Sequence, residues 1–405
     1  MSRQPRVGIV GAGPAGLIAA IAAVRLGLDA IVFERMTSFR RVGGGLVVHS
    51  NGQRVLEALG LLQAFRGLAL PVRTMLVERP DGTRLSTFDY REKPVPHNSA
   101  AVLLRADLQA FLLEEAVTAG VQVNWNWRST GVDLTPGLAT LRFAGGGAVP
   151  FDAVVAADGI HSAVRESLGL AAKQRAPRRA YLRGVAELAA TDDVVREVWG
   201  RDGRRFGVCP LPAGRSYFYC TAPLGRWQPT LRQDLPGWTD GWADFGPRVR
   251  AVVRSVADWG DVNYDEVHEV RLDRWWKGRA FVVGDAAHAM APDLGQGANA
   301  AMVDALVLLR LLAPALHGGG DVAVVGPAYQ SVRRHFVSDT QALAGQVGWL
   351  SNLVATPGML LQKAVLGLGS GIPVLGQHAR QLTCGFNPAE EPYLTPVATG
   401  ARVEI

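Results

Sequence analysis

Near its start, this chain has an apolar strand that runs into a glycine-rich turn and then into a helix. Val7–Val10 form the strand, and Gly11, Gly13 and Gly16 follow at G-x-G-x-x-G spacing before a segment rich in Ala and Leu. The first glycine allows a tight turn, the second lets the backbone approach a pyrophosphate, and the third lets helix and strand pack closely. Because a helix N-terminus also offers free N–H groups to phosphates, the pattern predicts a dinucleotide site in a Rossmann-like α/β fold.

Residues in and after this turn extend the predicted site. Pro14 and Ala15 lie inside the fingerprint, so we expect them to contact the dinucleotide. Glu34 closes a second apolar strand, and an acid roughly 20 residues after the fingerprint typically accepts hydrogen bonds from the ribose. Arg35 can add positive charge near the phosphates, although exposed arginines are usually just solvated. The alternative, an ordinary strand-to-helix turn, explains the glycines but not the acid that follows.

Two further glycine-bearing segments, Asp158–Arg165 and Gly284–Asn299, lie far along the chain. One glycine fingerprint alone is a weak signal, whereas three such segments in this order are a strong one. Asp285 directly follows an apolar strand, where an unpaired carboxylate is costly, so we expect it to be buried and to need a hydrogen-bonding partner. An aspartate that merely caps a helix in a structural turn is the alternative.

The chain resembles the single-component FAD-dependent aromatic hydroxylases, which include para-hydroxybenzoate, salicylate, 3-hydroxybenzoate and urate hydroxylases. The resemblance covers essentially the whole chain, through the fingerprint with Glu34 and Arg35, Gly43–Asn51, Leu104–Leu108 and the two later segments. It implies bound FAD, with NAD(P)H and O2 as reactants. It also implies hydroxylation or epoxidation of a small aromatic or heteroaromatic substrate through a flavin C4a-hydroperoxide. The residues alone imply only a dinucleotide.

The resemblance also implies roles for individual residues. Asp285 would bond a ribityl hydroxyl of FAD, and the Asp158 segment would touch both the FAD pyrophosphate and the transient nicotinamide nucleotide. Backbone N–H groups between Pro292 and Asn299, at a helix start, would stabilise negative charge on the reduced flavin. His288 is expected to be a packed structural histidine. The cofactor-binding residues implied are Gly11, Gly13, Pro14, Ala15, Gly16, Glu34, Arg35, Gly43, Gly45, Arg105, Asp158, Gly284, Asp285, Pro292, Gly295, Gly297, Ala298 and Asn299.

The run Gly43-Gly44-Gly45 departs from the para-hydroxybenzoate hydroxylase pattern, because Gly43 stands where that enzyme carries an arginine. A loop so free of side chains suggests that the flavin ring moves between a position for reduction and a position for oxygenation. Leu46–Val48 would then form the wall that the ring slides past. The alternative is that the glycines simply make room for the flavin.

Candidate substrate-pocket residues come from the middle of the chain and from the flavin-side segments. Strand alternation places Tyr217 and Tyr219 on one face, with Phe218 and Cys220 on the other. Each candidate is at least as well explained as a packing residue. The candidates are Pro292, Tyr217, Tyr219, Arg183 and His49, together with Phe206 and His97.

Three protein classes other than a monooxygenase are compatible with parts of this pattern. An FAD-dependent dehydrogenase or reductase would keep the fingerprint. A flavin-dependent halogenase would too, but its Trp-x-Trp-x-Ile-Pro motif is missing, and Trp275-Trp276 does not match it. A non-enzymatic flavin-binding protein fits three retained cofactor motifs least well. No metal-ligand cluster, Ser/His/Asp order or phosphate-transfer loop offers another catalytic centre.

The sequence pattern predicts a discontinuous α/β protein. We expect a Rossmann-like, doubly wound FAD-binding domain from residues 1–70, 101–175 and 273–310, and an inserted antiparallel-sheet substrate domain from 71–100 and 176–272. Residues 311–405 are expected to form a helical C-terminal region. Among the individual elements, a helix is predicted over Leu104–Ala119, with Leu104, Leu108, Phe111, Leu112 and Leu113 on its buried side.

Composition fits a soluble enzyme of 405 residues, 48% hydrophobic and 19% charged. Three cysteines make no disulfide framework, and the first strand begins too early for a signal peptide, so we expect a cytoplasmic protein. The net charge of +6 is scattered, which argues against a nucleic-acid partner. We expect a monomer or homodimer without an integral membrane segment. The apolar stretch Leu350–Leu375 is broken by Gly and Pro, which favours two short helices over a span, with peripheral membrane contact left open.

Overall fold

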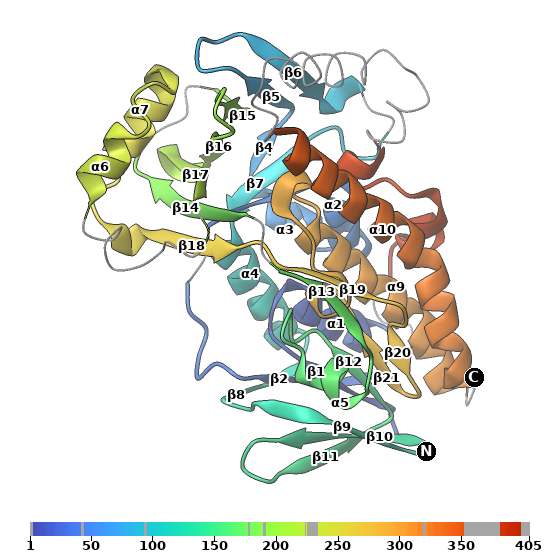
Figure 1. Ribbon diagram of the computed structural model, residues 1–405. Helices are drawn as coiled ribbons and strands as arrows, with labels where there is room; N and C mark the ends of the chain where they lie inside the picture. Colours follow the sequence, from blue (N-terminus) through green and yellow to red (C-terminus); the bar gives the residue numbers. More distant parts are fainter. Residues whose placement is uncertain are drawn as a thin grey trace.

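A six-stranded, mostly parallel sheet forms the centre of the molecule (Figure 1). The computed structural model describes residues 3–41, 44–92, 95–176, 179–188, 192–222, 224, 234–318, 321–351 and 381–397. Only the short edge strand β20 runs antiparallel to its neighbour. The strands, in their order across the sheet, are β20 (Trp276–Lys277), β21 (Ala280–Val282), β12 (Ala153–Ala156), β1 (Arg6–Val10), β2 (Asp29–Glu34) and β8 (Gln122–Trp125). The predicted α/β class is confirmed.

Helices cover one face of this sheet. Helix α1 (Pro14–Arg25) connects β1 to β2 and packs against α4 (Arg105–Thr118) and α9 (Gly297–His317). Ala19, Ala20, Ala22 and Ala23 of this helix are fully buried, which lets neighbouring helices approach closely. The rest of this layer includes α2 (Ser50–Ala58), α3 (Leu62–Arg66) and α10 (Val325–Ser351).

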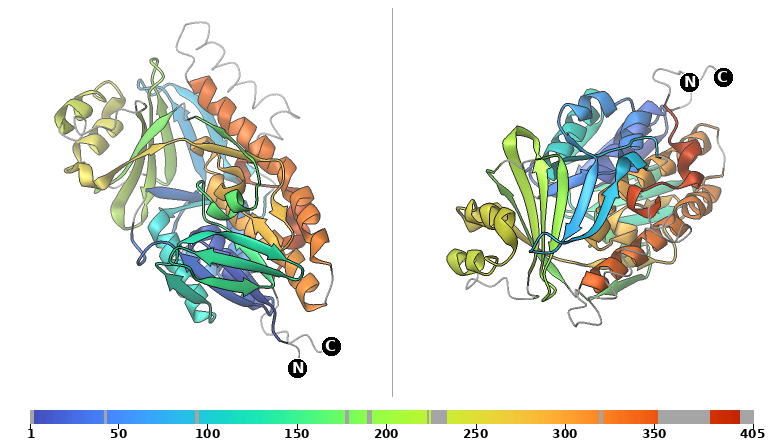
Figure 2. Two further views of the ribbon diagram at one scale, coloured as in Figure 1. Left: turned by 60° about the horizontal axis from the view of Figure 1, so that its bottom comes forward. Right: turned by 90° about the horizontal axis from the view of Figure 1, so that it is seen from above.

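The other face of the central sheet is covered by strands and not by helices, which differs from a doubly wound arrangement (Figure 2). The Phe151 ring packs so closely on β1 that a Cβ added to Gly8 would lie 2.6 Å from it. Apolar side chains on three strands bury this face as well as helices would. The covering sheet consists of β9 (Ser129–Thr135), β10 (Leu138–Phe143) and β11 (Ala148–Phe151).

A second large sheet lies to one side of the first and has the order β18-β14-β17-β16-β15-β5-β6. It was expected to be antiparallel, but β5 and β15 pair in parallel because they come from separate parts of the chain and no hairpin joins them. Helices α6 (Leu235–Asp240) and α7 (Gly246–Arg254) cover its outer face. The strands are β5 (Thr74–Glu78), β6 (Arg84–Asp89), β14 (Ala180–Ala186), β15 (Val194–Trp199), β16 (Arg205–Leu211), β17 (Arg215–Ala222) and β18 (Val262–Glu266).

Two small sheets and several short helices join these layers. Strands β3 (Gly45–Val48) and β4 (Leu70–Val72) pair with β7 (Ala100–Leu104), and β13 (Ala172–Arg175) pairs with β19 (Glu269–Leu272). The remaining short helices include α5 (Ala163–Ser167), α8 (Asp285–His288), η1 (Tyr90–Glu92), η2 (Pro212–Gly214), η4 (Trp259–Asp261), η5 (Pro292–Leu294), η6 (Val322–Val324) and η7 (Pro388–Tyr393).

The predicted helix over 104–119 is found with one correction at its start. Leu104 completes strand β7, so α4 begins at Arg105. Leu104 and Leu113 are half-buried and not core residues. Gly120 has φ +89°, a left-handed conformation that glycine adopts easily just after a helix.

Helix α9 has the length and mean hydropathy of a membrane span, but 67% of its most apolar window is buried inside the protein. Burial against α1, α2 and α10 explains this composition without a membrane. The apolar stretch Leu350–Leu375 lies outside the described residues, apart from Leu350 and Ser351 at the end of α10.

Candidate active site

The glycine motifs, far apart in sequence, meet at the carboxyl edge of the central sheet. Gly11 follows β1, Glu34 ends β2, Asp158 follows β12 and Gly284 follows β21. The four strands are parallel neighbours, and the chain order reverses between β1 and β12. Ligands in open α/β sheets bind at such a reversal, outside the carboxyl ends of the strands.

The first fingerprint has the backbone geometry of a pyrophosphate site. Gly11 has φ +103°, and a Cβ added there would lie 2.4 Å from the Ala157 carbonyl oxygen. A Cβ on Gly16 would lie 1.9 Å from the Gly11 carbonyl oxygen, so helix α1 packs too closely for any side chain. By contrast, nothing lies within 4 Å of a Cβ added to Gly13. Gly13 is the N-cap of α1 and no side chain caps it, which leaves open space and free N–H groups for a phosphate.

Glu34 braces this turn and still has capacity to bind. Its carboxylate accepts the backbone N–H of Ala12 at 2.8 Å and that of Met36 at 3.0 Å, one on each oxygen. A carboxylate oxygen has two lone pairs, so each oxygen retains one for a ribose hydroxyl. The neighbouring Arg35 is exposed.

Asp285 corrects an expectation, because its side chain is exposed and not buried. Gly284 turns the chain with φ +59°, and the carboxylate that follows points away from the core with no hydrogen bond to any described residue. The position therefore needs no protein partner. It offers a free anionic acceptor beside the fingerprint.

A buried ionic network lies directly behind this turn. Asp304 on α9 accepts the Gly284 N–H at 3.0 Å and contacts His288 Nε2. It also accepts a hydrogen bond from Arg333 Nε at 2.7 Å, and Arg333 reaches Glu390. Burial alone would raise the pKa of Asp304, but the charges of His288 and Arg333 lower it to about 2. His288 is thus held in a structural network, as its packing in the motif suggests.

The loop from Pro292 to Asn299 presents a second uncapped helix start. Gly295 is left-handed at φ +64°, and α9 begins at Gly297 with no side-chain cap. The Asn299 side chain is fully buried. It accepts the His49 N–H and donates to the carbonyl oxygens of Val47 and Gly295, each at 2.9 Å. Asn299 therefore shapes the loop with its side chain, while Gly297 and Ala298 leave backbone N–H groups available.

His49 supports this loop from behind. Its Nδ1 lies 2.7 Å from the Tyr90 hydroxyl, and a Cβ on Gly295 would come within 3.0 Å of its Nε2. Burial lowers the pKa of His49 to about 4, so the imidazole is neutral at neutral pH. The structure places it in the core, which suits a residue that positions the loop.

Tyr217, Tyr219 and Arg183 share one face of the second sheet. Arg183 lies opposite Tyr219 in the β14–β17 register, and the tyrosine rings are 6.0 Å apart. The Tyr217 ring covers the Gly44–Gly45 backbone, where an added Cβ would lie 2.4 Å from the ring at either glycine. Burial raises the pKa of both tyrosines, so both keep their hydroxyl protons at neutral pH.

Two other candidates lie elsewhere. Phe206, with Phe218 and Cys220, packs in the hydrophobic cluster under α6 and α7, on the opposite face of the sheet from Tyr217. The predicted alternation is therefore correct, and Phe206 does not share a face with Tyr217 and Tyr219. His97 Nε2 lies 3.2 Å from Glu57 on α2.

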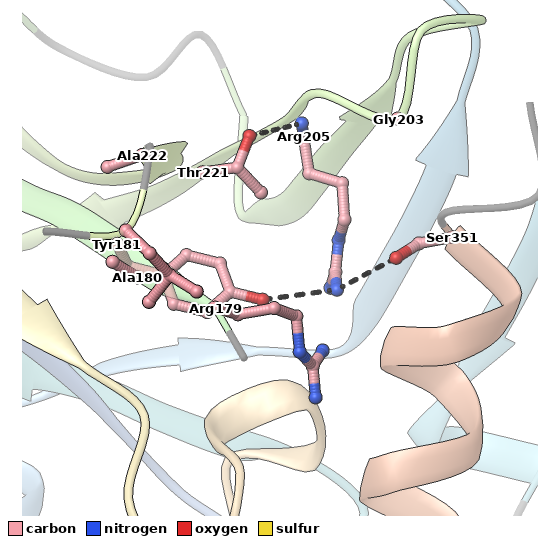
Figure 3. A pocket seen from close by; sticks show the side chains of 9 residues that line it. Arg179, Ala180, Tyr181, Gly203, Arg205, Thr221, Ala222 and Ser351 are labelled. Atoms are coloured by element: carbon pink, nitrogen blue, oxygen red, sulfur yellow. Dashed lines mark hydrogen bonds between the residues drawn. The ribbon is translucent and has the colours of Figure 1, made fainter. Parts of the chain in front are cut away.

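Sequence reasoning missed a buried cluster centred on Asp293, whose side chain is fully buried. Its Oδ1 lies 2.8 Å from Arg179 Nη1 and 2.5 Å from Arg205 Nη1. Arg205 also reaches Tyr181 and Ser351 across a cavity of about 240 Å³ (Figure 3). The cluster ties the Pro292 loop to the second sheet. The only sequence signal was a charged residue inside a Pro/Gly loop.

The Asp158 segment is tied to the Asp285 segment. Arg165 is buried, and its guanidinium donates to the carbonyl oxygens of Ala286 at 3.1 Å and Ile160 at 3.0 Å. Asp158 accepts the Val164 N–H at 3.3 Å, and burial raises the pKa of its carboxyl group. Arg165 thus couples the two segments and is not a free phosphate ligand.

Two implied cofactor residues remain. Arg105 begins α4, has an exposed side chain and donates its backbone N–H to the Gly44 carbonyl oxygen at 3.0 Å. Gly43 lies outside the described residues.

Comparison with known proteins identifies the ligand of the site that the glycine motifs form. A protein-family model described as an FAD binding domain matches residues 4–343. The chain belongs to the FAD-dependent aromatic hydroxylase family. It is 32% identical to the FAD-dependent urate hydroxylase of Mycolicibacterium vanbaalenii over 82% of this chain and 85% of that protein. It is 31% identical to the 3-amino-4-hydroxybenzoate 2-monooxygenase PtmB3 of Streptomyces platensis, over 78% of this chain and 81% of that protein.

Solved structures agree with this family assignment. Klebsiella pneumoniae HpxO complexed with FAD and uric acid aligns at a TM-score of 0.81 and 26% identity, covering 94% of this chain and 97% of that one. The open space at Gly13, the spare acceptors of Glu34 and the exposed Asp285 fit FAD. This FAD-dependent hydroxylase is an oxidoreductase with FAD as its resident cofactor, and O2 and a reduced nicotinamide nucleotide are its co-substrates.

Proposed function

We propose that this hydroxylase adds one oxygen atom to a small aromatic or heteroaromatic substrate, by hydroxylation or epoxidation. The proposal is supported by relatives named for urate and for 3-amino-4-hydroxybenzoate. The observation that carries it is the face of Tyr217, Tyr219 and Arg183, which meets β3 beside the Pro292 loop. Aromatic rings and one guanidinium on one surface suit a flat substrate that bears an acidic group.

Bound FAD supplies reduction by NAD(P)H and activation of O2. The chain's own residues must then place the substrate and exclude water. Tyr217 and Tyr219 keep their protons, so they act as hydrogen-bond donors that orient the substrate and not as bases. Arg183 attracts its negative charge. The uncapped N-terminus of α9 favours negative charge on the cofactor. We propose that Gly11, Gly13, Glu34 and Asp285 hold FAD.

The division of the chain into domains, its location in the cell and its oligomeric state are part of the same proposal. We assign residues 1–70, 101–175 and 273–310 to a cofactor domain, 71–100 and 176–272 to a substrate domain, and 311–405 to a helical region. The division is supported by the central sheet, whose strands all come from the first set, and by the second sheet, whose strands all come from the second. We propose a cytoplasmic monomer or homodimer. The cytoplasmic location is supported by the three buried cysteines, which form no disulfide and so suit a reducing compartment.

The test is a substrate screen on the purified yellow protein. Phenolic and heteroaromatic acids are screened for stimulated NADH and NADPH oxidation, with uncoupled peroxide production subtracted. The expected result is a product that carries one extra oxygen atom derived from ¹⁸O2. Stimulated NAD(P)H oxidation that leaves a reduced product without added oxygen would instead assign a reductase.

A further inference from the structure

We propose that a cleft between the β13–β19 ribbon and α10 is a binding site for a small multivalent oxyanion of the phosphate class. The cleft has a volume of about 350 Å³, and α8 contributes Ala287 and His288 to its lining. It lies behind the Gly284 turn, on residues that the proposed hydroxylation does not use.

The cleft brings together four cationic side chains. In the antiparallel β13–β19 register, Lys173 lies directly opposite Arg271, a like-charge pairing that is destabilising unless something neutralises it. Arg175 follows two residues later, hence on the same face of the ribbon, and Arg334 lines the cleft from α10.

The acidic groups nearby leave this charge partly unneutralised. Asp273 is shared between Lys173 at 3.0 Å and Arg334 at 3.3 Å. Glu269 lies 3.7 Å from Arg175. Within the described part of the chain, Arg271 pairs with no carboxylate, and its Nε is buried without a hydrogen-bond acceptor.

Two more buried nitrogens that lack a partner belong to residues lining the same cleft. Trp275 and His288 are each 2% exposed, and Trp275 Nε1 and His288 Nδ1 make no hydrogen bond among the described residues. Indole N–H is only a donor, and a buried donor left unsatisfied is costly. Such atoms are rare in folded proteins unless a water or ligand satisfies them.

Together these groups match a phosphate better than a single carboxylate. A phosphate presents several acceptor oxygens and close to two negative charges, which suits an excess of cations and several N–H donors. The cleft is near the small end of ligand pockets, about 300–1,000 Å³, which suits a phosphate group more than an extended substrate.

An anion bound in the cleft should also affect the Gly284 turn, which presents Asp285 to the cofactor. His288 lines the cleft and contacts Asp304 through Nε2, and Asp304 accepts the Gly284 N–H. An anion held at His288 therefore stabilises the residues that fix Gly284, so it should slow release of FAD.

The test is isothermal titration calorimetry of the holoenzyme in phosphate-free buffer at constant ionic strength, with inorganic phosphate in one arm and ADP in the other. We expect one saturable site, weakened at least about tenfold in Arg271→Gln because a charged hydrogen-bonding group is lost. Lys173→Gln, at an exposed position, should weaken it in the same direction. The control Arg142→Gln removes an exposed arginine that pairs with Asp133 on the distant β9–β10 hairpin, and it should bind as the wild type does.

The two arms separate the sources of the phosphoryl group. Tighter binding of inorganic phosphate identifies the free ion, and tighter binding of ADP identifies a nucleotide, provided that Arg271→Gln weakens either one. Absence of saturable binding in both arms overturns the site, as does equal binding by wild type, Arg271→Gln and Lys173→Gln. Saturable binding that leaves the FAD release rate unchanged overturns the coupling to Gly284.

Discussion

Asp304 accepts the backbone N–H of Gly284 at 3.0 Å, and this bond ties the cofactor turn to the core of helix α9. The same carboxylate contacts His288 and Arg333 and is fully buried. One core side chain thus fixes the backbone that presents the exposed Asp285.

Replacement of Asp304 should therefore damage both the fold and the cofactor site. In Asp304→Ala, the buried Arg333 and His288 lose their shared partner, and breaking a buried ion pair in this way costs about 3–5 kcal/mol. We expect a loss of this size in the free energy of unfolding, measured with denaturant, and faster release of FAD. Asp133→Ala, which removes an exposed ion pair, is the control and should change stability by less than about 0.5 kcal/mol. Similar stability of the two variants would contradict a central role for Asp304.

Asp285 should affect FAD binding without affecting the fold. Its carboxylate is exposed and makes no hydrogen bond with a described residue, so Asp285→Ala should leave the free energy of unfolding of the apoprotein nearly unchanged. Loss of a charged acceptor for a ribityl hydroxyl should weaken FAD binding by about 1.5–3 kcal/mol. Fluorescence titration of the apoprotein with FAD measures this. Asp240→Ala on α6 is an exposed control, and equal affinity of the two variants would remove Asp285 from the FAD site.

The fingerprint could be predicted from sequence because its geometry is local. A side chain at Gly16 would collide with the Gly11 carbonyl oxygen, and a side chain at Gly11 would collide with the Ala157 carbonyl oxygen after the adjacent strand. Because these contacts are local to the turn, the spacing of the glycines is enough to predict them. Asp285 shows the limit. Its neighbour Gly284 turns the chain outward at positive φ, which no apolar pattern reveals, so the expected burial was wrong.

Contacts between side chains far apart in the chain could not be predicted from the sequence pattern. Arg205 and Asp293 are 88 residues apart and meet only because the second sheet folds back over the Pro292 loop. Neither residue belongs to a motif with a fixed spacing. The Gly43–Gly45 run could likewise be explained in two ways. The sequence shows that side chains are missing there, but it does not show which group fills the space.

His49 should make stability depend on pH. Burial lowers its folded-state pKa from 6.5 to about 4, which corresponds to about 3 kcal/mol at about 1.4 kcal/mol per pH unit. Between these values the unfolded chain binds the proton and the folded chain does not, so stability falls as pH drops from 6.5 to 4 and is unaffected above 6.5. His49→Gln should flatten the pH dependence of the unfolding free energy by about this amount. His335→Gln, at a position 89% exposed, is the control. A wild-type slope in His49→Gln would contradict the assignment.

The last prediction separates two explanations of the glycines at the start of β3. Gly45 does not have a positive φ, so an added methyl group strains no dihedral, but it would lie 2.4 Å from the Tyr217 ring. Gly45→Ala should destabilise the protein by about 1–3 kcal/mol through overpacking. Gly345→Ala, where nothing lies within 4 Å of the added Cβ, should not destabilise it.

The double variant Gly45→Ala/Tyr217→Ala then decides the role of the space above Gly45. Removing the ring removes the two closest contacts of the added methyl group, at 2.4 and 2.5 Å, and leaves Tyr217 Cβ at 2.8 Å. The loss of stability in the double variant should therefore be smaller than the sum for the two single variants, by about 0.5–3 kcal/mol. If Gly45 serves only to seat Tyr217, the double variant should be reduced by NAD(P)H, in stopped-flow measurements, as fast as Tyr217→Ala is. If the glycines instead let the flavin ring move, reduction should stay slower in the double variant than in Tyr217→Ala, because the added methyl group remains beside β3 whether or not the tyrosine is present.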